Sequence, residues 1–235
     1  MVSIEDAVAY PMESDEWLKT VLIGGVLTVF GFLLIPMLPV YGYIVRTLRH
    51  RLDGRPEPPS FGEWGSLFVD GLKAWIIGII YLIIPLTVGG ITVGGSITAM
   101  AIGSRSGSAA GVAGLIGGLL ITFVLTLVFG YFAVVAVVNF AREDRFGAAF
   151  DLDMIRAVAL DRDYAIPWGV SIVVFIVAGV IASVLNIIPF LGFAVGSFVF
   201  FYAQIVAASL WADGFAAALG TQPETSDTDV SEPMV

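Results

Sequence analysis

Few residues in this chain of 235 could carry out acid–base, nucleophilic or metal chemistry. There is no cysteine and only one histidine, His50, so a zinc site built from several such ligands is excluded. The remaining candidates are two Asp-x-Asp pairs, Asp151/Asp153 and Asp161/Asp163. They could hold a divalent cation with a phosphorylated donor, or simply form the solvated face of a helix in an acidic protein. We expect the second role, no metal, no cofactor and no enzymatic activity.

Polar side chains in apolar segments form a second class of candidates. Gln204 is the deepest of them, whereas Asn139 and Asp213 lie nearer to segment ends. A hydrogen bond from Gln204 to a neighbouring helix is the favoured interpretation, with contact to a substrate as the alternative. A polar cavity walled by Gln204, Asn139 and Tyr131 would favour a transporter.

Four arginines follow the ends of apolar segments: Arg46, Arg49, Arg142 and Arg145. Guanidinium groups suit phosphate oxygens, and basic groups between spans can hold anionic lipid head groups. The alternative is that these arginines only set the orientation of the chain. We name the four as candidate contacts for anionic lipid and identify no catalytic residue.

The composition indicates which elements must position these residues. Hydrophobic residues make up 58% of the chain and charged residues 13%, with a mean hydropathy of +0.95. Soluble domains are roughly 45–50% apolar and about 25% charged. An ordinary soluble domain is therefore excluded, and we predict an all-α integral membrane protein.

The charge balance bears on source and partners. There are 20 acidic against 11 basic residues, and Lys19 and Lys73 are the only lysines. This acidity argues against a nucleic-acid partner. It favours a halophilic archaeal source with an acidic proteome, because concentrated salt screens the repulsion between acidic groups. The alternative is an ordinary acidic protein in which the two tails alone supply the excess of acidic over basic residues.

Spanning a bilayer takes ~20 apolar residues, and five segments qualify: 21–45, 72–98, 111–140, 166–188 and 190–211. We predict a bundle of about five transmembrane helices, in a range of four to six, over residues 17–219. Residues 1–16 are a polar, acidic N-terminus. Residues 220–235 form an acidic tail that lacks the apolar content to fold and should be disordered.

The first segment contains Pro36 and Pro39, which leave two interpretations. A single crossing is favoured and places the N-terminus outside. The alternative is a re-entrant pair, since backbone freed by proline is tolerated at membrane depth where protein covers it. The side of the N-terminus therefore stays open.

Orientation follows from two charged loops, residues 46–71 and 141–165, which hold most of the basic residues. Two spans separate these loops, so they share a side, and the positive-inside rule makes that side cytoplasmic. We expect a multi-pass protein of the cell membrane with the C-terminal tail also in the cytoplasm.

Each charged loop also carries apolar residues at helical spacing. These are Phe61, Trp64, Leu67, Phe68 and Leu72 in one loop and Phe150, Met154, Ile155 and Val158 in the other. The pattern predicts two amphipathic helices lying in the headgroup region on the cytoplasmic side.

Several short motifs carry a resemblance: Gly42-Tyr43 leading into Arg46 and Arg49, then Phe61-Gly-Glu-Trp64, then Asp70-Gly-Leu-Lys73. In this order the chain resembles an uncharacterised archaeal membrane family, domain-of-unknown-function family 4013, over about residues 14–218. The resemblance implies a multi-pass helical protein and brings no catalytic or binding residue with it.

We therefore expect a non-enzymatic scaffold, partner subunit or lipid-associated modulator. The alternative is a transporter-like protein for a small apolar or lipidic solute, suggested by the proline-broken spans and the glycine pairs. The expected partners are the lipid bilayer, with anionic lipid head groups or another membrane protein as further possibilities. The G-x-x-x-G pairs 90/94, 114/118 and 192/196 allow close helix contact, and we favour packing within the chain over dimerisation.

Overall fold

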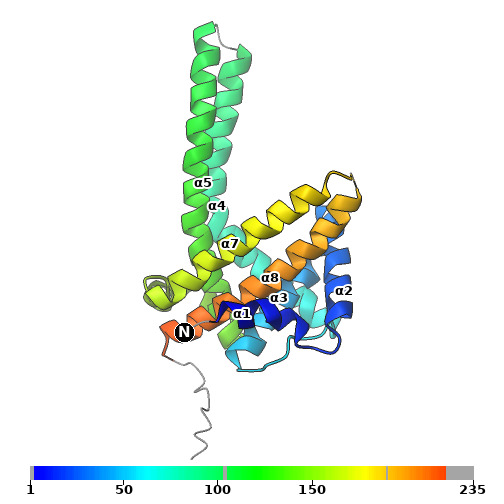
Figure 1. Cartoon of the computed structure of the whole chain (residues 1–235). Helices are drawn as coiled ribbons and strands as arrows, with labels where there is room; N and C mark the ends of the chain where they lie inside the picture. The colour runs from blue at the N-terminus through cyan, green and yellow to red at the C-terminus, as the bar shows by residue number, and fades with distance from the viewer. Residues whose placement is uncertain (1–2, 103–104, 189, 221–235) are drawn as a thin grey trace, which may run out of the picture.

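A computed structural model describes residues 3–102, 105–188 and 190–220, and all regular secondary structure in these ranges is helical. The all-α prediction is thus confirmed, while the predicted tail lies outside the described residues from 221 onwards. Figure 1 shows a body from which a long arm projects. The body contains α1 (Ile4–Ala9), α2 (Trp17–Val29), α3 (Met37–Leu52), α7 (Arg162–Leu185) and α8 (Leu191–Ala218). The arm consists of the later part of α4 (Trp64–Ile102) and the first part of α5 (Arg105–Glu143), and the short α6 (Leu152–Ala159) leads from α5 to α7.

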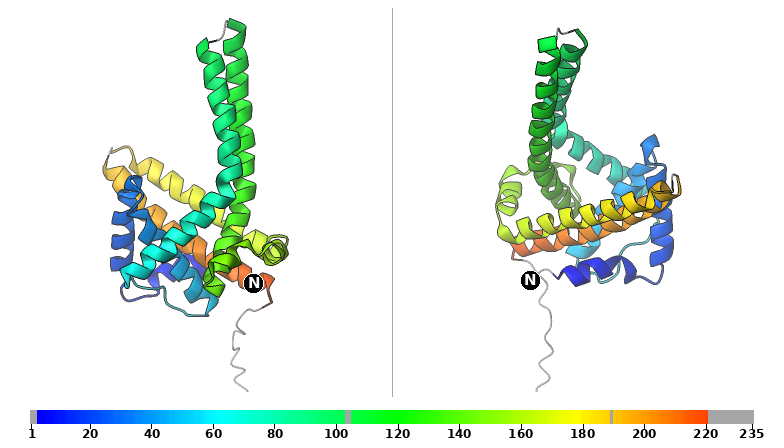
Figure 2. Two further views of the ribbon diagram at one scale, coloured as in Figure 1. Left: turned by 180° about the vertical axis from the view of Figure 1, so that it is seen from behind. Right: turned by 45° about the horizontal axis from the view of Figure 1, so that its top comes forward.

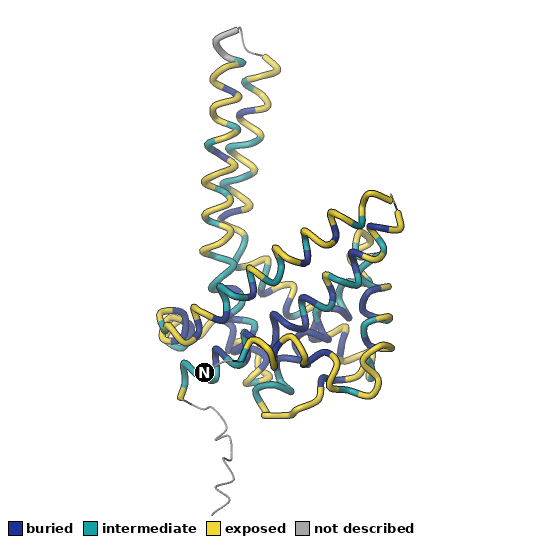
Figure 3. Tube along the Cα trace, viewed as in Figure 1, coloured by how far each residue is buried: buried dark blue, intermediate teal, exposed yellow. Residues whose placement is uncertain are grey.

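Four of these helices, α4, α5, α7 and α8, are long and apolar enough to cross a membrane, and α2 is a shorter apolar helix. Most of the arm is exposed in the isolated chain (Figure 3). Ile91 and Phe123, for example, are 70% and 61% exposed. Apolar side chains that face outward along long helices are what lipid solvates. The structure therefore agrees with the predicted helical membrane bundle.

The first apolar segment does not form one continuous helix. A 3-10 turn, η2 (Gly31–Leu33), separates α2 from α3, and Pro36 caps the start of α3. Phe201 of α8 lies against both Gly24 and Tyr43, whereas a straight helix would hold those two residues about 28 Å apart. Proline lacks the N–H that a continuous helix requires. The segment is therefore a hairpin of α2 and α3 and not one straight helix, which agrees with the alternative of a re-entrant pair; how it meets the membrane stays a prediction.

Both ends of this hairpin lie at the same end of the molecule. The guanidinium carbon of Arg51, near the end of α3, lies 4.6 Å from the centre of the Tyr10 ring, which precedes α2. Arg49 and Arg51 form ion pairs with Asp144 after α5 and with Asp213 near the end of α8. We call this region the polar end (residues 46–63, 139–161 and 213–218). The two charged loops share a side, as predicted.

The two amphipathic helices have different outcomes. Residues 64–72 are the first part of the continuous helix α4, so the prediction of a separate helix there is wrong. Figure 2 shows that α4 instead changes direction between this part and the arm, and Pro85 lies inside the helix. The second predicted helix is confirmed as a separate helix, α6, in which Ile155 and Val158 are buried while Asp153 is exposed. Its position at the headgroups stays a prediction.

The core lies where the base of the arm meets the body. Its largest fully buried side chains include Tyr43, Leu67, Phe140, Ile205 and Phe215, from α3, α4, α5 and α8. The polar end therefore lies next to a packed apolar layer, and the helices that carry its charged side chains are fixed by this packing.

Candidate functional site

The residues that carry the family resemblance meet where α3 crosses α4. Gly42 and Gly71 lie at the crossing and let the two backbones touch. Beside them Tyr43 stacks on Phe61, with ring centres 4.5 Å apart, and Phe61 lies 5.8 Å from Trp64. The short motifs thus describe one joint between two helices and the loop that connects them.

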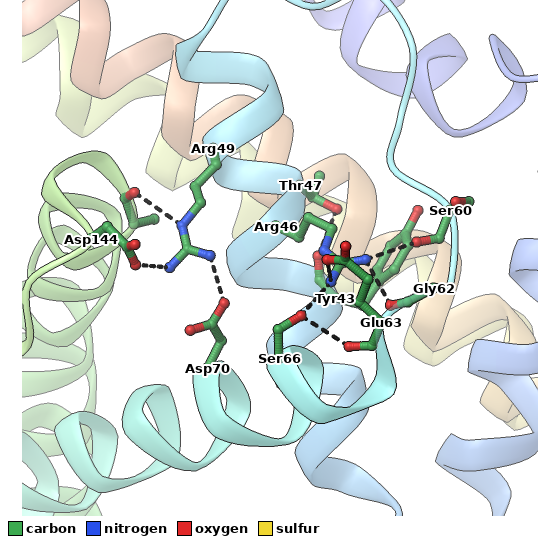
Figure 4. A network of polar contacts seen from close by, with 11 residues as sticks. Tyr43, Arg46, Thr47, Arg49, Ser60, Gly62, Glu63, Ser66, Asp70 and Asp144 are labelled. Carbon is green, nitrogen blue, oxygen red and sulfur yellow. Dashed lines mark hydrogen bonds and ion pairs between the residues drawn. The ribbon is translucent and has the colours of Figure 1, made fainter.

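Arg49 connects three helices at the polar end (Figure 4). Its guanidinium donates hydrogen bonds to the Asp70 carboxylate of α4 at 2.5 Å and to the Asp144 carboxylate at 2.6 Å. Its Nε donates to the carbonyl oxygen of Ala141 at 3.3 Å. Asp144 has a φ of 51°, a left-handed conformation that aspartate adopts more readily than most residues. Arg49 therefore holds α3, α4 and the end of α5 together.

Arg46 anchors the loop between α3 and α4 (Figure 4). One nitrogen donates to the carbonyl oxygens of Gly62 at 2.9 Å and Ser60 at 3.3 Å, and the other donates to the Ser66 hydroxyl at 2.8 Å. The Glu63 carboxylate lies 3.7 Å away. The guanidinium replaces water for backbone groups that no helix satisfies.

Arg142 and Arg145 share one acidic partner at the end of α5. Arg142 donates to the Glu143 carboxylate at 2.7 Å and to the side-chain oxygen of Asn139 at 3.1 Å. Arg145 pairs with the same carboxylate of Glu143. The Arg142 guanidinium also lies 5.6 Å from the centre of the Phe215 ring in α8.

All four predicted lipid contacts thus have partners within the chain. The side chains of Arg46, Arg49 and Arg142 are 17%, 24% and 30% exposed, and that of Arg145 is 70% exposed. The structure places all four at the polar end, but it directs their donors to carbonyl, hydroxyl and carboxylate oxygens of the chain itself. Their contact with anionic lipid stays a prediction.

The ion pair between Arg51 and Asp213 is a contact that the sequence pattern did not predict. The Nε and Nη2 atoms of Arg51 donate to the two carboxylate oxygens of Asp213 at 3.2 and 2.6 Å. Asp213 is the only acidic residue after the fourth apolar segment within the described part of the chain, which is a signal that it needs a partner. No spacing rule pairs it with a residue 162 positions earlier.

An open polar cavity of about 330 Å³ lies beside the end of α3, lined among others by Arg46, His50, Arg55 and Glu63. His50 Nδ1 lies 3.4 Å from the carbonyl oxygen of Glu57, and His50 Nε2 lies 3.3 Å from Arg55 Nη1. A neutral ring with its proton on Nδ1 satisfies both contacts. Burial lowers the pKa of His50, and the Arg55 charge lowers it further, against the opposing hydrogen bond to Glu57.

The first aspartate of each Asp-x-Asp pair acts as a helix cap. Asp151 accepts a hydrogen bond from the Met154 amide at the start of α6, and Asp161 accepts one from the Asp163 amide at the start of α7. Among the described residues, no group of three or more acidic or histidine side chains could hold a metal ion. The four aspartates therefore do not converge on one point.

A second cavity is mainly apolar, has a volume of about 450 Å³, and lies between the arm and the body. We call it the apolar cleft. Five helices contribute to it, α3, α4, α5, α7 and α8, with Tyr41, Trp75, Val137, Phe175, Gln204 and Trp211 among the lining residues. Ligand pockets usually measure about 300–1,000 Å³, so the cleft is large enough for a small lipophilic molecule.

Gln204 lines the apolar cleft, and its amide bonds to no residue that the structure describes. The expected hydrogen bond to a neighbouring helix is therefore not formed. Asn139 and Tyr131 lie elsewhere, since they donate to the carbonyl oxygens of Ala148 at 2.8 Å and Ala159 at 2.6 Å. A cavity walled by all three residues is thus not present in the described structure, although Gln204 does line one.

Four long apolar helices, a charged end and an apolar cleft define a multi-pass helical membrane protein. The chain belongs to the family described as "Protein of unknown function (DUF4013)", whose profile matches residues 23–187. The match includes the joint between α3 and α4 and both charged loops, and it ends before α8. No curated protein and no solved structure matches the chain.

Proposed function

We propose that this protein is a non-enzymatic, lipid-associated membrane protein that holds a small apolar or lipidic molecule in the apolar cleft. The observation that carries the proposal is the cavity of about 450 Å³, whose wall comes from five helices. An empty cavity of this size forfeits the dispersion contacts of its lining. A lipophilic molecule from the bilayer restores those contacts and stabilises the arrangement.

Filling the cleft tests this proposal. Gly78 lines the cleft, and a Cβ atom added there would meet no atom within 4 Å. Gly130 of α5 has the same open surroundings but is not among the lining residues, which makes it a matched control. Lipophilic compounds that co-purify with wild type, Gly78→Phe and Gly130→Phe are extracted and quantified by mass spectrometry.

We expect a compound at near-stoichiometric amounts in wild type and in Gly130→Phe, and its loss from Gly78→Phe. Equal amounts in all three proteins would contradict cleft binding.

A transporter-like role for the same solute is the second candidate, favoured by the position of the cleft between the arm and the body. Movement of the solute across proteoliposome membranes, abolished by Gly78→Phe, would distinguish transport from retention.

A partner-subunit role is favoured by one pair of glycines. Gly114 packs against Ser96 within the arm, as predicted for intramolecular contact. Gly90 and Gly94 instead face open space in the described structure. Small residues on an open face allow a second helix to approach closely, so cross-linking through Gly94→Cys tests whether a partner occupies this face.

The same proposal places the polar end in the cytoplasm, because basic residues concentrate there. It also proposes a halophilic archaeal source, which the acidic composition favours. Anionic lipid head groups would then meet Arg145, the most exposed of the four candidate arginines. Retention of anionic lipid should fall in Arg145→Gln and stay at the wild-type value in Arg156→Gln, an exposed control on α6. Native mass spectrometry measures both.

A further inference from the structure

We infer that the occupant of the apolar cleft is a neutral, ring-bearing molecule with a carbonyl oxygen, and that Gln204 selects it. This inference rests on the cleft-binding function proposed above and names the class of its ligand.

Three residues that line the cleft carry hydrogen-bond donors without an acceptor in the described part of the chain. These donors are the Gln204 amide, the Tyr41 hydroxyl and the Trp75 indole N–H. In contrast, the indole N–H of Trp211 already donates to the Ser171 hydroxyl at 2.9 Å, so Trp211 offers the cleft only its ring. Lipid tails cannot accept hydrogen bonds, so these donors stay unsatisfied unless the occupant supplies an acceptor.

The donors of Gln204, Tyr41 and Trp75 favour a ligand with an uncharged hydrogen-bond acceptor. An indole has a donor only, a phenol has one donor, and a primary amide has two donors besides its oxygen. A carbonyl oxygen accepts up to two hydrogen bonds and so matches a wall in which donors predominate. No charged residue is among those that line the cleft. A carboxylate or phosphate would therefore be buried without a counter-charge, which is costly.

The remaining wall favours a flat ring. Tyr41, Trp75, Phe175 and Trp211 come from four different helices and place four aromatic side chains around one cavity. Aromatic groups pair in offset-stacked or edge-to-face arrangements. A ring-bearing ligand can make such contacts on several sides, which a single acyl chain cannot.

The position of Gln204 along α8 favours a free lipophilic ligand over a membrane lipid. Along α8, Gln204 precedes the ion-paired Asp213 by nine residues, which is about 14 Å of helix. The ester carbonyls of membrane lipids lie near the headgroups, and Gln204 lies well inward of the polar end. The ligand is therefore one that enters the hydrocarbon region entirely.

Thermal unfolding of the purified full chain, followed by far-UV circular dichroism, tests the inference with three probes. 2-Methyl-1,4-naphthoquinone carries a ring and carbonyls, 2-methylnaphthalene carries the same ring without them, and methyl palmitate carries a carbonyl without a ring. A bound molecule raises the Tm by mass action. We expect the naphthoquinone to raise the Tm of wild type by several degrees and the other two probes to raise it less.

The variant Gln204→Leu keeps the volume of the side chain and removes the amide. In this variant we expect the naphthoquinone to give only the small rise seen with 2-methylnaphthalene. Tyr41→Phe and Trp75→Phe remove one donor each and should give intermediate rises, whereas Trp64→Phe, outside the cleft, should behave as wild type. These variants also test the inference if Gln204→Leu fails to fold.

Equal naphthoquinone rises in wild type and in the donor variants would overturn the selection by Gln204. A larger rise with methyl palmitate would overturn the ring-bearing class. If no probe raises the Tm but Gly78→Phe still loses its co-purified compound, this inference fails and cleft binding stands. If Gly78→Phe also matches wild type, both fail.

Discussion

Gly42 and Gly71 each face the opposing backbone where α3 crosses α4. A Cβ atom on Gly42 would lie 1.9 Å from the carbonyl oxygen of Leu67, and one on Gly71 would lie 1.8 Å from that of Leu38. Both distances are far below contact distance, so the helices meet backbone to backbone. Because Asp70 directly precedes Gly71, this crossing also sets the distance between Asp70 and Arg49.

Gly71→Ala should destabilise the protein by about 3 kcal/mol or more, because the methyl group must push two backbones apart. Gly65→Ala is the matched control in the same helix, since nothing lies within 4 Å of its Cβ position. Alanine there should change stability by less than about 1 kcal/mol, in the stabilising direction. Unfolding in a mixed-detergent titration measures both, and equal stability of the two variants would contradict the close crossing.

Arg49→Gln should destabilise the protein by about 3 kcal/mol or more, because it leaves the buried Asp70 carboxylate without its counter-charge. Arg55→Gln breaks the exposed pair with Asp53 and should cost less than about 1 kcal/mol. Adding Asp70→Asn to Arg49→Gln should recover part of the loss. Failure of the double variant to recover stability would show that Arg49 does not act through Asp70.

The loop after α3 should loosen as the pH falls, because the pKa of His50 is lowered in the folded protein. Neutral His50 contributes stability that is fully present above its ordinary pKa of about 6.5 and is lost as the pH falls through the folded value. Protonation places a second cation against Arg55. Because intrinsic exchange itself slows as the pH falls, the measured quantity is the protection factor. Protection of the amides in residues 53–63 should therefore fall between about pH 7 and pH 5 in wild type, beyond the change in His50→Gln. Parallel pH profiles would show that another group is responsible.

Single cysteines can decide the topology, because the chain has none of its own. The hairpin of α2 and α3 predicts that Met12→Cys, Glu57→Cys and Gly147→Cys react with a membrane-impermeant maleimide from the same side. Ala109→Cys, near the far end of the arm, should react from the opposite side. If Met12→Cys reacts together with Ala109→Cys, the first apolar segment crosses once and the hairpin is wrong.

Much of the fold follows from local sequence. Continuous apolar runs predict α4, α5, α7 and α8 because a helix is the only way for each run to satisfy its own backbone in lipid. The spacing of Ile155 and Val158 likewise predicts α6. The residues 64–72 also have helical spacing, but nothing in that spacing shows that their helix continues without a break into the next span.

Hydrophobicity and charge by themselves determined that this is a multi-pass membrane protein with its charged loops on one side, since both depend on residues close together in the chain. Tertiary structure alone decided that the first segment reverses, because Phe201, more than 150 residues away, packs against Gly24 and Tyr43. It also decided that Arg49 faces Asp144 and that Gln204 faces a cavity. Side-chain partners from distant helices depend on how the helices cross, and that geometry is set by close contacts such as Gly42 against Leu67.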